Sequence, residues 1–180
     1  MKQFILLFCL VFMFVSCNNE TKDNAASEPA KTDAAAADVK LPFELAGPYR
    51  NWQIGSTENV VAAMAGLKAF VDNDFAALAA VTGDSITLDF DNFQTKVSRD
   101  TAMNFFKDAR KMYNDIKITM YDYVSVISAD KKAEWVTLWY KQVWKNEKGV
   151  ADSLNVVNDI RLENGKMVEL DEKSSHFQKK

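Results

Sequence analysis

The sequence predicts an α+β domain in which a curved antiparallel sheet wraps around three helices. Three helical patterns and one short alternating segment come first, and four long segments rich in Val, Ile, Tyr, Trp and Thr follow. One of these, 133–145, carries large side chains on both faces. A flat sheet with one solvated face does not need such bulk, so we expect a curved sheet that holds the helices inside and meets a partner outside.

Each predicted helix has a polar residue at its start. The first is predicted over 57–72, because apolar side chains recur at helical spacing after the candidate caps Ser56 and Thr57. A short second helix follows Asp74, and a third, longer helix with a wide apolar stripe follows Ser98. These helices have to cover an apolar surface.

The strands are predicted from alternation and from the turns between them. The segment "SITLDFD" (85–91) alternates apolar and polar residues, as a strand with one buried face does. Four longer strands are predicted near 116–128, 133–145, 151–163 and 166–174. The loops "ADKK", "NEKG" and "ENGK" that separate them are short enough to make consecutive strands antiparallel neighbours.

The first 17 residues have the pattern of an export signal. One positive charge, Lys2, precedes an apolar run from Phe4 to Val15, which is too short for a membrane-spanning helix of roughly 20 residues. Cys9 lies inside this segment, so its removal leaves Cys17 without an intrachain disulfide partner. A free thiol, an intermolecular link and a lipid anchor are the alternatives for Cys17.

The stretch "FVSC" (14–17) resembles the processing box of bacterial lipoproteins, in the relaxed form found in Bacteroidota. The resemblance implies that the segment 1–17 is a lipoprotein signal peptide cut before Cys17, which is then lipidated. It also implies a lipid-anchored protein of the bacterial cell envelope, at the periplasmic or outer surface of the outer membrane. The membrane is therefore the first expected partner.

The segment that follows is predicted to be a disordered tether. Residues 18–40 are polar, Ala-rich and almost free of large apolar side chains, so they cannot form a core. By random-coil scaling they hold the domain, residues 41–180, roughly 25 to 30 Å from the lipid. Without Lys2 the chain has 21 basic and 25 acidic residues, a net charge of −4, which argues against binding to nucleic acid.

The element order, with "DNDFAALAAV" (72–81) before the first strand and "NDIRLENGKMVEL" (158–170) near the end, resembles the NTF2-like superfamily. This superfamily includes SnoaL-like cyclases and ketosteroid isomerases. The resemblance implies a cone-shaped domain that holds a small apolar or aromatic ligand inside and dimerises through the outer face of its sheet. It implies little about activity, because the fold serves many functions.

Two aspartates match the acidic positions of the isomerase-like enzymes. The resemblance places Asp89 at the general base and Asp159 at the protonated acid that binds the developing oxyanion. The expected tyrosine of the first helix is replaced by Ala65 or Gly66. Alternation also puts Asp89 on the polar side of its strand, so surface or structural roles for both aspartates are the alternative.

An aromatic group gives a second candidate site. Tyr121, Tyr123, Trp135 and Trp139 lie on adjacent predicted strands and are expected to cluster, either in core or dimer packing or against a flat ligand. Polar contacts to such a ligand would come from Asn155, Asn158 or Asp159. The sequence does not assign these residues to one sheet face, because bulges in long strands change the register.

No cofactor and no metal site is expected. The only histidine, His176, lies in a charged tail, and the six glycines are scattered singly, without a phosphate-binding loop. We therefore expect a lipid-anchored NTF2-like domain that binds a small molecule or acts as a scaffold, and that forms a homodimer. An isomerase-like enzyme using Asp89 as base and a purely structural envelope protein are the alternatives.

Overall fold

The computed structural model describes residues 41–44, 51–91 and 93–176. The predicted signal peptide, Cys17 and the predicted tether lie outside the described residues. The expectations about export, lipidation and the tether therefore stay predictions.

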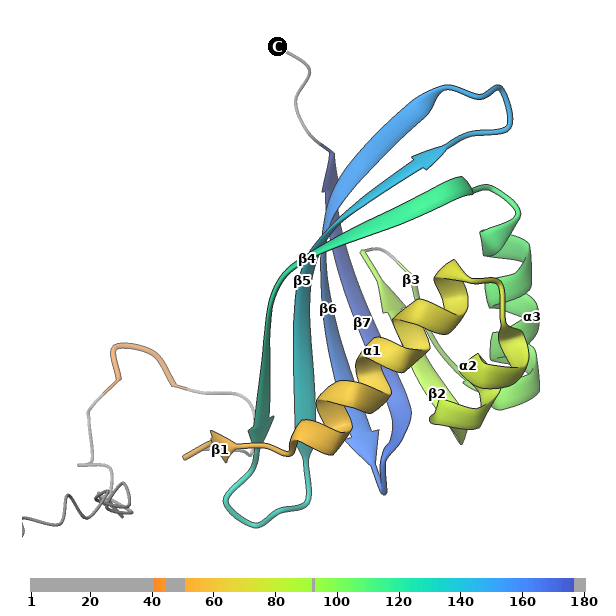
Figure 1. Ribbon diagram of the computed structural model, residues 1–180. Helices are drawn as coiled ribbons and strands as arrows, with labels where there is room; N and C mark the ends of the chain where they lie inside the picture. Colours follow the sequence, from red (N-terminus) through yellow and green to blue (C-terminus); the bar gives the residue numbers. More distant parts are fainter. Residues whose placement is uncertain (1–40, 45–50, 92, 177–180) are drawn as a thin grey trace, which may run out of the picture. The chain divides into compact units, whose positions relative to one another are not determined.

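Three helices and seven strands make up the described part of the domain (Figure 1). The helices are α1 (Thr57–Val71), α2 (Phe75–Val81) and α3 (Arg99–Arg110); the strands are β1 (Gln53–Ile54), β2 (Thr82–Phe90), β3 (Phe93–Ser98), β4 (Asn114–Ile127), β5 (Glu134–Lys145), β6 (Ala151–Glu163) and β7 (Lys166–His176). No helix in the described ranges is long and apolar enough to cross a membrane.

The three predicted helix starts are confirmed. The side chains of Ser56, Asp74 and Ser98 each accept a hydrogen bond from the backbone N–H three residues on, as N-cap residues do. Each cap satisfies one of the N–H groups that the first helical turn leaves without a partner. The short α2 ends at Thr82, where the chain turns directly into β2.

All seven strands belong to one curved sheet, in the order β1-β4-β5-β6-β7-β2-β3. Neighbours are antiparallel except for β2 and β7, which run parallel and make the sheet mixed. The four long strands of the prediction are confirmed within a few residues. The prediction missed β1, which has only two residues, and β3, an edge strand that is largely exposed and lacks an apolar alternation.

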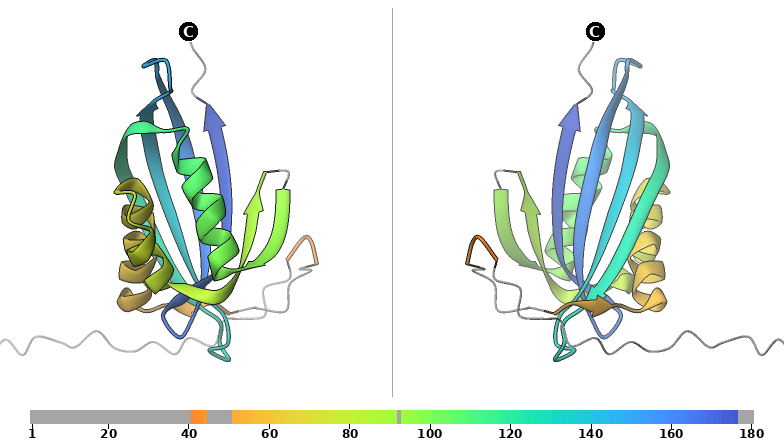
Figure 2. Two further views of the ribbon diagram at one scale, coloured as in Figure 1. Left: turned by 90° about the vertical axis from the view of Figure 1, so that its right-hand side faces the viewer. Right: turned by 90° about the vertical axis from the view of Figure 1, so that its left-hand side faces the viewer.

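The helices pack on the concave face of the sheet, and the core lies between the two layers (Figures 1 and 2). In the right-hand view of Figure 2 the sheet faces the viewer and the helices lie behind it. Strand β5 shows the separation of faces: Val136, Leu138 and Tyr140 are buried against the helices, whereas Trp135 and Trp139 point to the other side and are half-buried.

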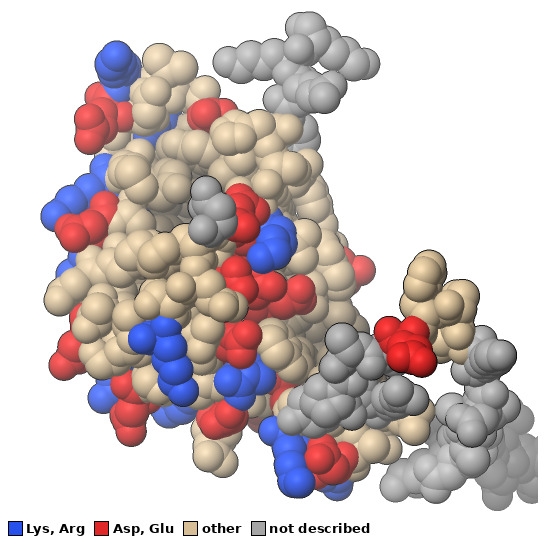
Figure 3. All heavy atoms as spheres, turned by 180° about the vertical axis from the view of Figure 1, so that it is seen from behind, with Lys and Arg blue, Asp and Glu red and all other residues tan. Residues whose placement is uncertain are grey.

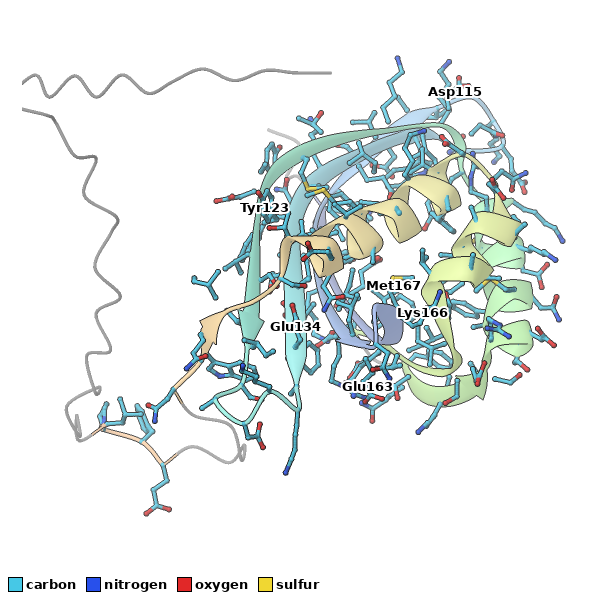
Figure 4. All side chains as sticks on the ribbon, turned by 60° about the horizontal axis from the view of Figure 1, so that its bottom comes forward. Asp115, Tyr123, Glu134, Glu163, Lys166 and Met167 are labelled. Carbon is cyan, nitrogen blue, oxygen red and sulfur yellow. The ribbon has the colours of Figure 1, made fainter. Side chains whose placement is uncertain are left out.

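The start of α1 is fixed to the sheet by one carboxylate. The backbone N–H of Ser56 donates to Oε1 of Glu134 at 2.6 Å, and Glu134 lies beside the start of α1 in Figure 4. Gly55 allows this close approach, because a Cβ there would lie 2.2 Å from Oγ of Ser125. This contact sets the position from which α1 crosses the sheet.

Candidate functional site

A cavity of about 240 Å³ lies between the helices and the concave face of the sheet. Its lining is mostly apolar and aromatic, which is typical of small-molecule sites. The lining residues are Ala63, Gly66, Leu67 and Phe70 of α1; Leu78 of α2; Ile86 and Phe90 of β2; Phe105, Phe106 and Ala109 of α3; Met112 and Tyr113 after α3; and Tyr140, Gln142, Asn158, Ile160, Met167, Leu170 and Glu172 of β5, β6 and β7.

The cavity opens to solvent beside the end of α3. Two of its lining residues, Phe105 and Met112, are exposed. Phe105 stacks on Phe90 and Phe93 with ring centroids 5.7 and 6.0 Å apart, so the β2–β3 hairpin forms one side of the opening. Entry therefore passes aromatic rings and a flexible methionine.

Two polar side chains, Tyr140 and Asn158, form a pair at the inner wall. Tyr140 is 2% exposed and Asn158 5% exposed, and Nδ2 of Asn158 donates to the Tyr140 hydroxyl oxygen at 3.1 Å. The amide oxygen of Asn158 has no hydrogen-bond partner in the described part of the chain. A buried acceptor without a partner costs about 1 to 3 kcal/mol, so this oxygen indicates a place for a water or ligand donor.

The Tyr140 hydroxyl stays protonated and can donate. Burial raises the pKa of Tyr140 well above its ordinary value, the negative charge of Glu172 raises it further, and the hydrogen bond from Asn158 lowers it only in part. Because Tyr140 accepts from Asn158, its own proton remains for another acceptor. The pair thus leaves one donor and one acceptor without a partner in the described part of the chain.

Glu172 is the ionisable carboxyl of the lining. It is half-buried on β7 and lies directly opposite Asn158 of β6 and Phe90 of β2 in the strand register. Burial raises the pKa of Glu172 to about 7, and the negative charge of Asp91 contributes to the rise. Burial also raises the pKa of Tyr113, with a further contribution from Glu172. Glu172 therefore changes its charge near neutral pH.

The place of the missing helix tyrosine is closed by a methionine. A Cβ on Gly66 would lie 2.7 Å from Cε and 2.8 Å from Sδ of Met167, so the thioether packs directly against the backbone of α1. Figure 4 shows Met167 between the sheet and this helix. A tyrosine ring at this point of α1 has no room unless Met167 moves.

Asp89, Asp159 and Asp171 form one row on the opposite face of the sheet. Asp171 of β7 is the register partner of both Asp89 on β2 and Asp159 on β6. The two predicted catalytic residues therefore flank Asp171, one on each neighbouring strand. Neither lines the cavity. Asp89 is hydrogen-bonded to Gln94 at 2.8 Å and lies 3.6 Å from the Lys173 ammonium. Asp159 accepts from the Thr137 hydroxyl at 2.5 Å.

Acidic and basic side chains are interspersed on the surface of the domain. Figure 3 shows acidic side chains gathered near the centre of the face seen from behind, with basic ones beside them. On the outer sheet face Lys173 also pairs with Asp171 at 2.5 Å, and Arg161 pairs with Glu169 at 2.9 Å. In the described ranges, no three His, Cys, Asp or Glu side chains are grouped as a metal site.

The four aromatic residues of the predicted second site do not form one cluster. Trp135 and Trp139 lie on the outer face, whereas the register pairs Tyr123 with Leu138 of the inner face. The cause is an irregularity between Met120 and Asp122, which leaves Tyr121 without a register partner. Tyr121 and Tyr123 are both exposed. None of these four aromatic residues lines the cavity.

Of the two predicted asparagines, only Asn158 reaches the cavity. Asn155 lies an odd number of residues away on the same strand and points to the other face, where its amide oxygen is buried without a partner among the described residues. Sequence reasoning missed Glu172, Tyr140 and Gln142 as lining residues. The alternation of β5 did indicate that Tyr140 points inward with Leu138, but it gave no sign of a cavity there.

No protein-family model and no curated protein matches the chain, whereas many solved structures do. An NTF2-like protein of unknown function from Burkholderia pseudomallei has a TM-score of 0.56 and 12% identity, over 67% of this chain and 92% of that one. An LEH-like epoxide hydrolase from M. tuberculosis has a TM-score of 0.53 and 15% identity, over 67% and 84%.

A third neighbour is a hypothetical protein with a ketosteroid isomerase-like fold from Catenulispora acidiphila, solved in complex with trimethylamine. Its TM-score is 0.51 at 10% identity, over 62% of this chain and 83% of that one. At such identities the likeness concerns the fold alone. The chain has the NTF2-like fold: a curved sheet wrapped around three helices, as the sequence predicts.

The raised pKa of Glu172 predicts a pH dependence of stability. Its carboxyl binds a proton with a pKa of about 7 in the folded state and with its ordinary value of 4.5 when unfolded, so the native state binds more protons between these values. The free energy of unfolding should fall by about 2 to 3 kcal/mol as the pH rises from about 5 to about 8. Urea denaturation at several pH values measures this.

The variant Glu172→Gln should flatten that pH dependence, because the titrating group is gone. Asp171→Asn is the matched control, since it removes the adjacent carboxylate from the outer face and leaves Glu172 in place. An unchanged slope in Glu172→Gln would contradict the assignment of the titration to Glu172.

Proposed function

We propose that the domain binds a small, mostly apolar molecule in the cavity between α1, α3 and the sheet. The observation that carries this proposal is the buried pair Tyr140 and Asn158, whose hydroxyl proton and amide oxygen have no partner among the described residues. Leu or Phe at these two positions would fill the core without burying a polar group that lacks a hydrogen bond. The pair is therefore best explained by a ligand that completes its hydrogen bonds.

A second candidate is proton transfer, with Glu172 in the role predicted for Asp89. The carboxyl of Glu172 lines the cavity and has a pKa of about 7, which suits a general base, and the Tyr140 hydroxyl can donate to a developing oxyanion. Asp89 lies outside the cavity beside Lys173. Turnover that depends on Glu172 and survives Asp89→Asn would favour this candidate over the original assignment.

We further propose that the domain is tied to the cell envelope through lipidated Cys17. The observations that support this are the apolar run before Cys17 and the polar, Ala-rich segment after it. With the 23 residues of 18–40 as tether, the cavity would stay close to the membrane surface, where apolar molecules concentrate. An outer-membrane location fits this arrangement.

A homodimer is proposed through the outer face of the sheet. Trp135, Trp139, Val126 and Val157 are half-buried there, and no described helix covers them. In a pure scaffold protein this surface would matter and the cavity would not. The scaffold reading therefore predicts that changes inside the cavity leave the function unaffected.

The ligand proposal predicts that filling the cavity abolishes an adduct. In native mass spectrometry, the full chain purified from its own cells should carry a reproducible small-molecule mass. Ala109→Leu should lose it, because the larger side chain occupies the cavity from α3. Asn104→Leu, an exposed position of the same helix, is the control and should keep it. No adduct in any form, or equal adducts in all, would contradict the proposal.

The anchor proposal predicts the fate of Cys17→Ser. In cells fed an alkyne-labelled fatty acid, the natural chain should incorporate the label and sediment with membranes, whereas Cys17→Ser should do neither, because the thiol that takes the lipid is absent. Cys9→Ser, inside the predicted signal, is the control and should still be labelled. Full labelling of Cys17→Ser would refute the anchor.

A further inference from the structure

The charge inside the cavity has one sign. Glu172 is the only charged side chain in the described lining, which contains no Lys, Arg or His. The basic residue Arg110 at the end of α3 is not among the lining residues, and its guanidinium donates to the backbone oxygens of Phe70, Val71 and Tyr113. When Glu172 is ionised, its charge therefore repels an anion that enters the cavity and attracts a cation.

Two polar groups of the lining can accept hydrogen bonds from a ligand. When ionised, the Glu172 carboxylate only accepts hydrogen bonds, and the Asn158 amide oxygen has no donor in the described structure. The two residues are direct register partners on β6 and β7, which places their Cβ atoms about 5 Å apart on the same face. A single group with two or three N–H bonds, held between them, would satisfy both.

The rest of the cavity suits the body of such a ligand. The aromatic side chains of Phe70, Phe90, Phe105, Phe106 and Tyr113 line it, and Phe90 lies opposite Glu172 in the register of β2 and β7. Aromatic rings attract cations through their negative faces and also pack against hydrocarbon. The cavity therefore accommodates both the apolar part and the cationic group of such a ligand.

We propose that the ligand is a small hydrophobic amine, whose protonated nitrogen donates to the Glu172 carboxylate and to the Asn158 amide oxygen while its hydrocarbon part packs on the phenylalanine rings. This inference rests on the proposed ligand-binding function and names its substrate class. Tyr140 and Gln142 remain available to a further polar atom of the same molecule.

Binding of an amine requires the ionised form of Glu172, so it depends on pH. The titratable groups around Glu172 in the described structure are Asp91 directly after β2, Tyr113 after α3 and Tyr140 on β5; both tyrosines have raised pKa values and stay neutral. With a pKa of about 7, most Glu172 is ionised at pH 8 and only about a tenth at pH 6. Amine affinity should thus fall about tenfold between these pH values.

Three probes of similar size test the inference by isothermal titration calorimetry on the full chain: 2-phenylethylamine, 2-phenylethanol and phenylacetate. The expected order at pH 8 is amine first, alcohol next and carboxylate last, with at least tenfold between amine and alcohol. Glu172→Gln should remove this preference and its pH dependence while changing alcohol affinity less than about threefold. Asp171→Asn, on the outer face, should leave all affinities unchanged.

Two other outcomes distinguish failure of the amine assignment from failure of the proposed ligand-binding function. If the alcohol binds as well as the amine and Glu172→Gln changes neither, the amine assignment is overturned and the ligand site stands. If the three probes all fail to bind to the natural chain, and the purified chain also carries no adduct, both proposals fall.

Discussion

The period of two along each strand is the constraint on which the site depends. Successive side chains of β5, β6 and β7 point to opposite faces, and only one face is covered by helices. Asn158 and Glu172 therefore lie inside, and their sequence neighbours Asp159 and Asp171 lie outside. A shift of register by one residue would exchange the polar content of the cavity for that of the surface.

The same constraint explains why polar groups are held in an apolar interior. Cross-strand partners share a face, so the register of β6 with β5 and β7 sets Asn158 among the residues that face the helices. The Tyr140 hydroxyl takes one of the amide's hydrogen bonds, and the amide oxygen is buried without a partner among the described residues. Burying this oxygen without a partner costs free energy, and a ligand that donates a hydrogen bond to it would offset that cost.

Much of the fold could be predicted from the sequence because local signals were strong. The caps Ser56, Asp74 and Ser98 and the turns between long strands fix the helices and the antiparallel strands. The parallel pairing of β2 with β7 could not be predicted, since it joins segments far apart in the chain and has no turn to mark it.

The site was predicted less well for a physical reason. Residue type and resemblance point to Asp89 and Asp159, and each of them stands one residue from a lining position, Phe90 or Asn158. Glu172 gave no signal, because a glutamate in the charged segment "LDEKSS" looks like a solvated side chain until the sheet curvature encloses it. Tyr121 and Tyr123 were separated from the tryptophans by a bulge that periodicity does not reveal.

The most direct test of the central claim, that the cavity is a ligand site, is a methyl NMR titration of the full chain labelled at its methionines. Met112 and Met167 line the cavity, whereas Met103 is buried in the core outside it. On addition of 2-phenylethanol, the methyl signals of Met112 and Met167 should shift together and saturate while that of Met103 stays in place. Signals that do not move, or that all move without saturation, would contradict a specific site in the cavity.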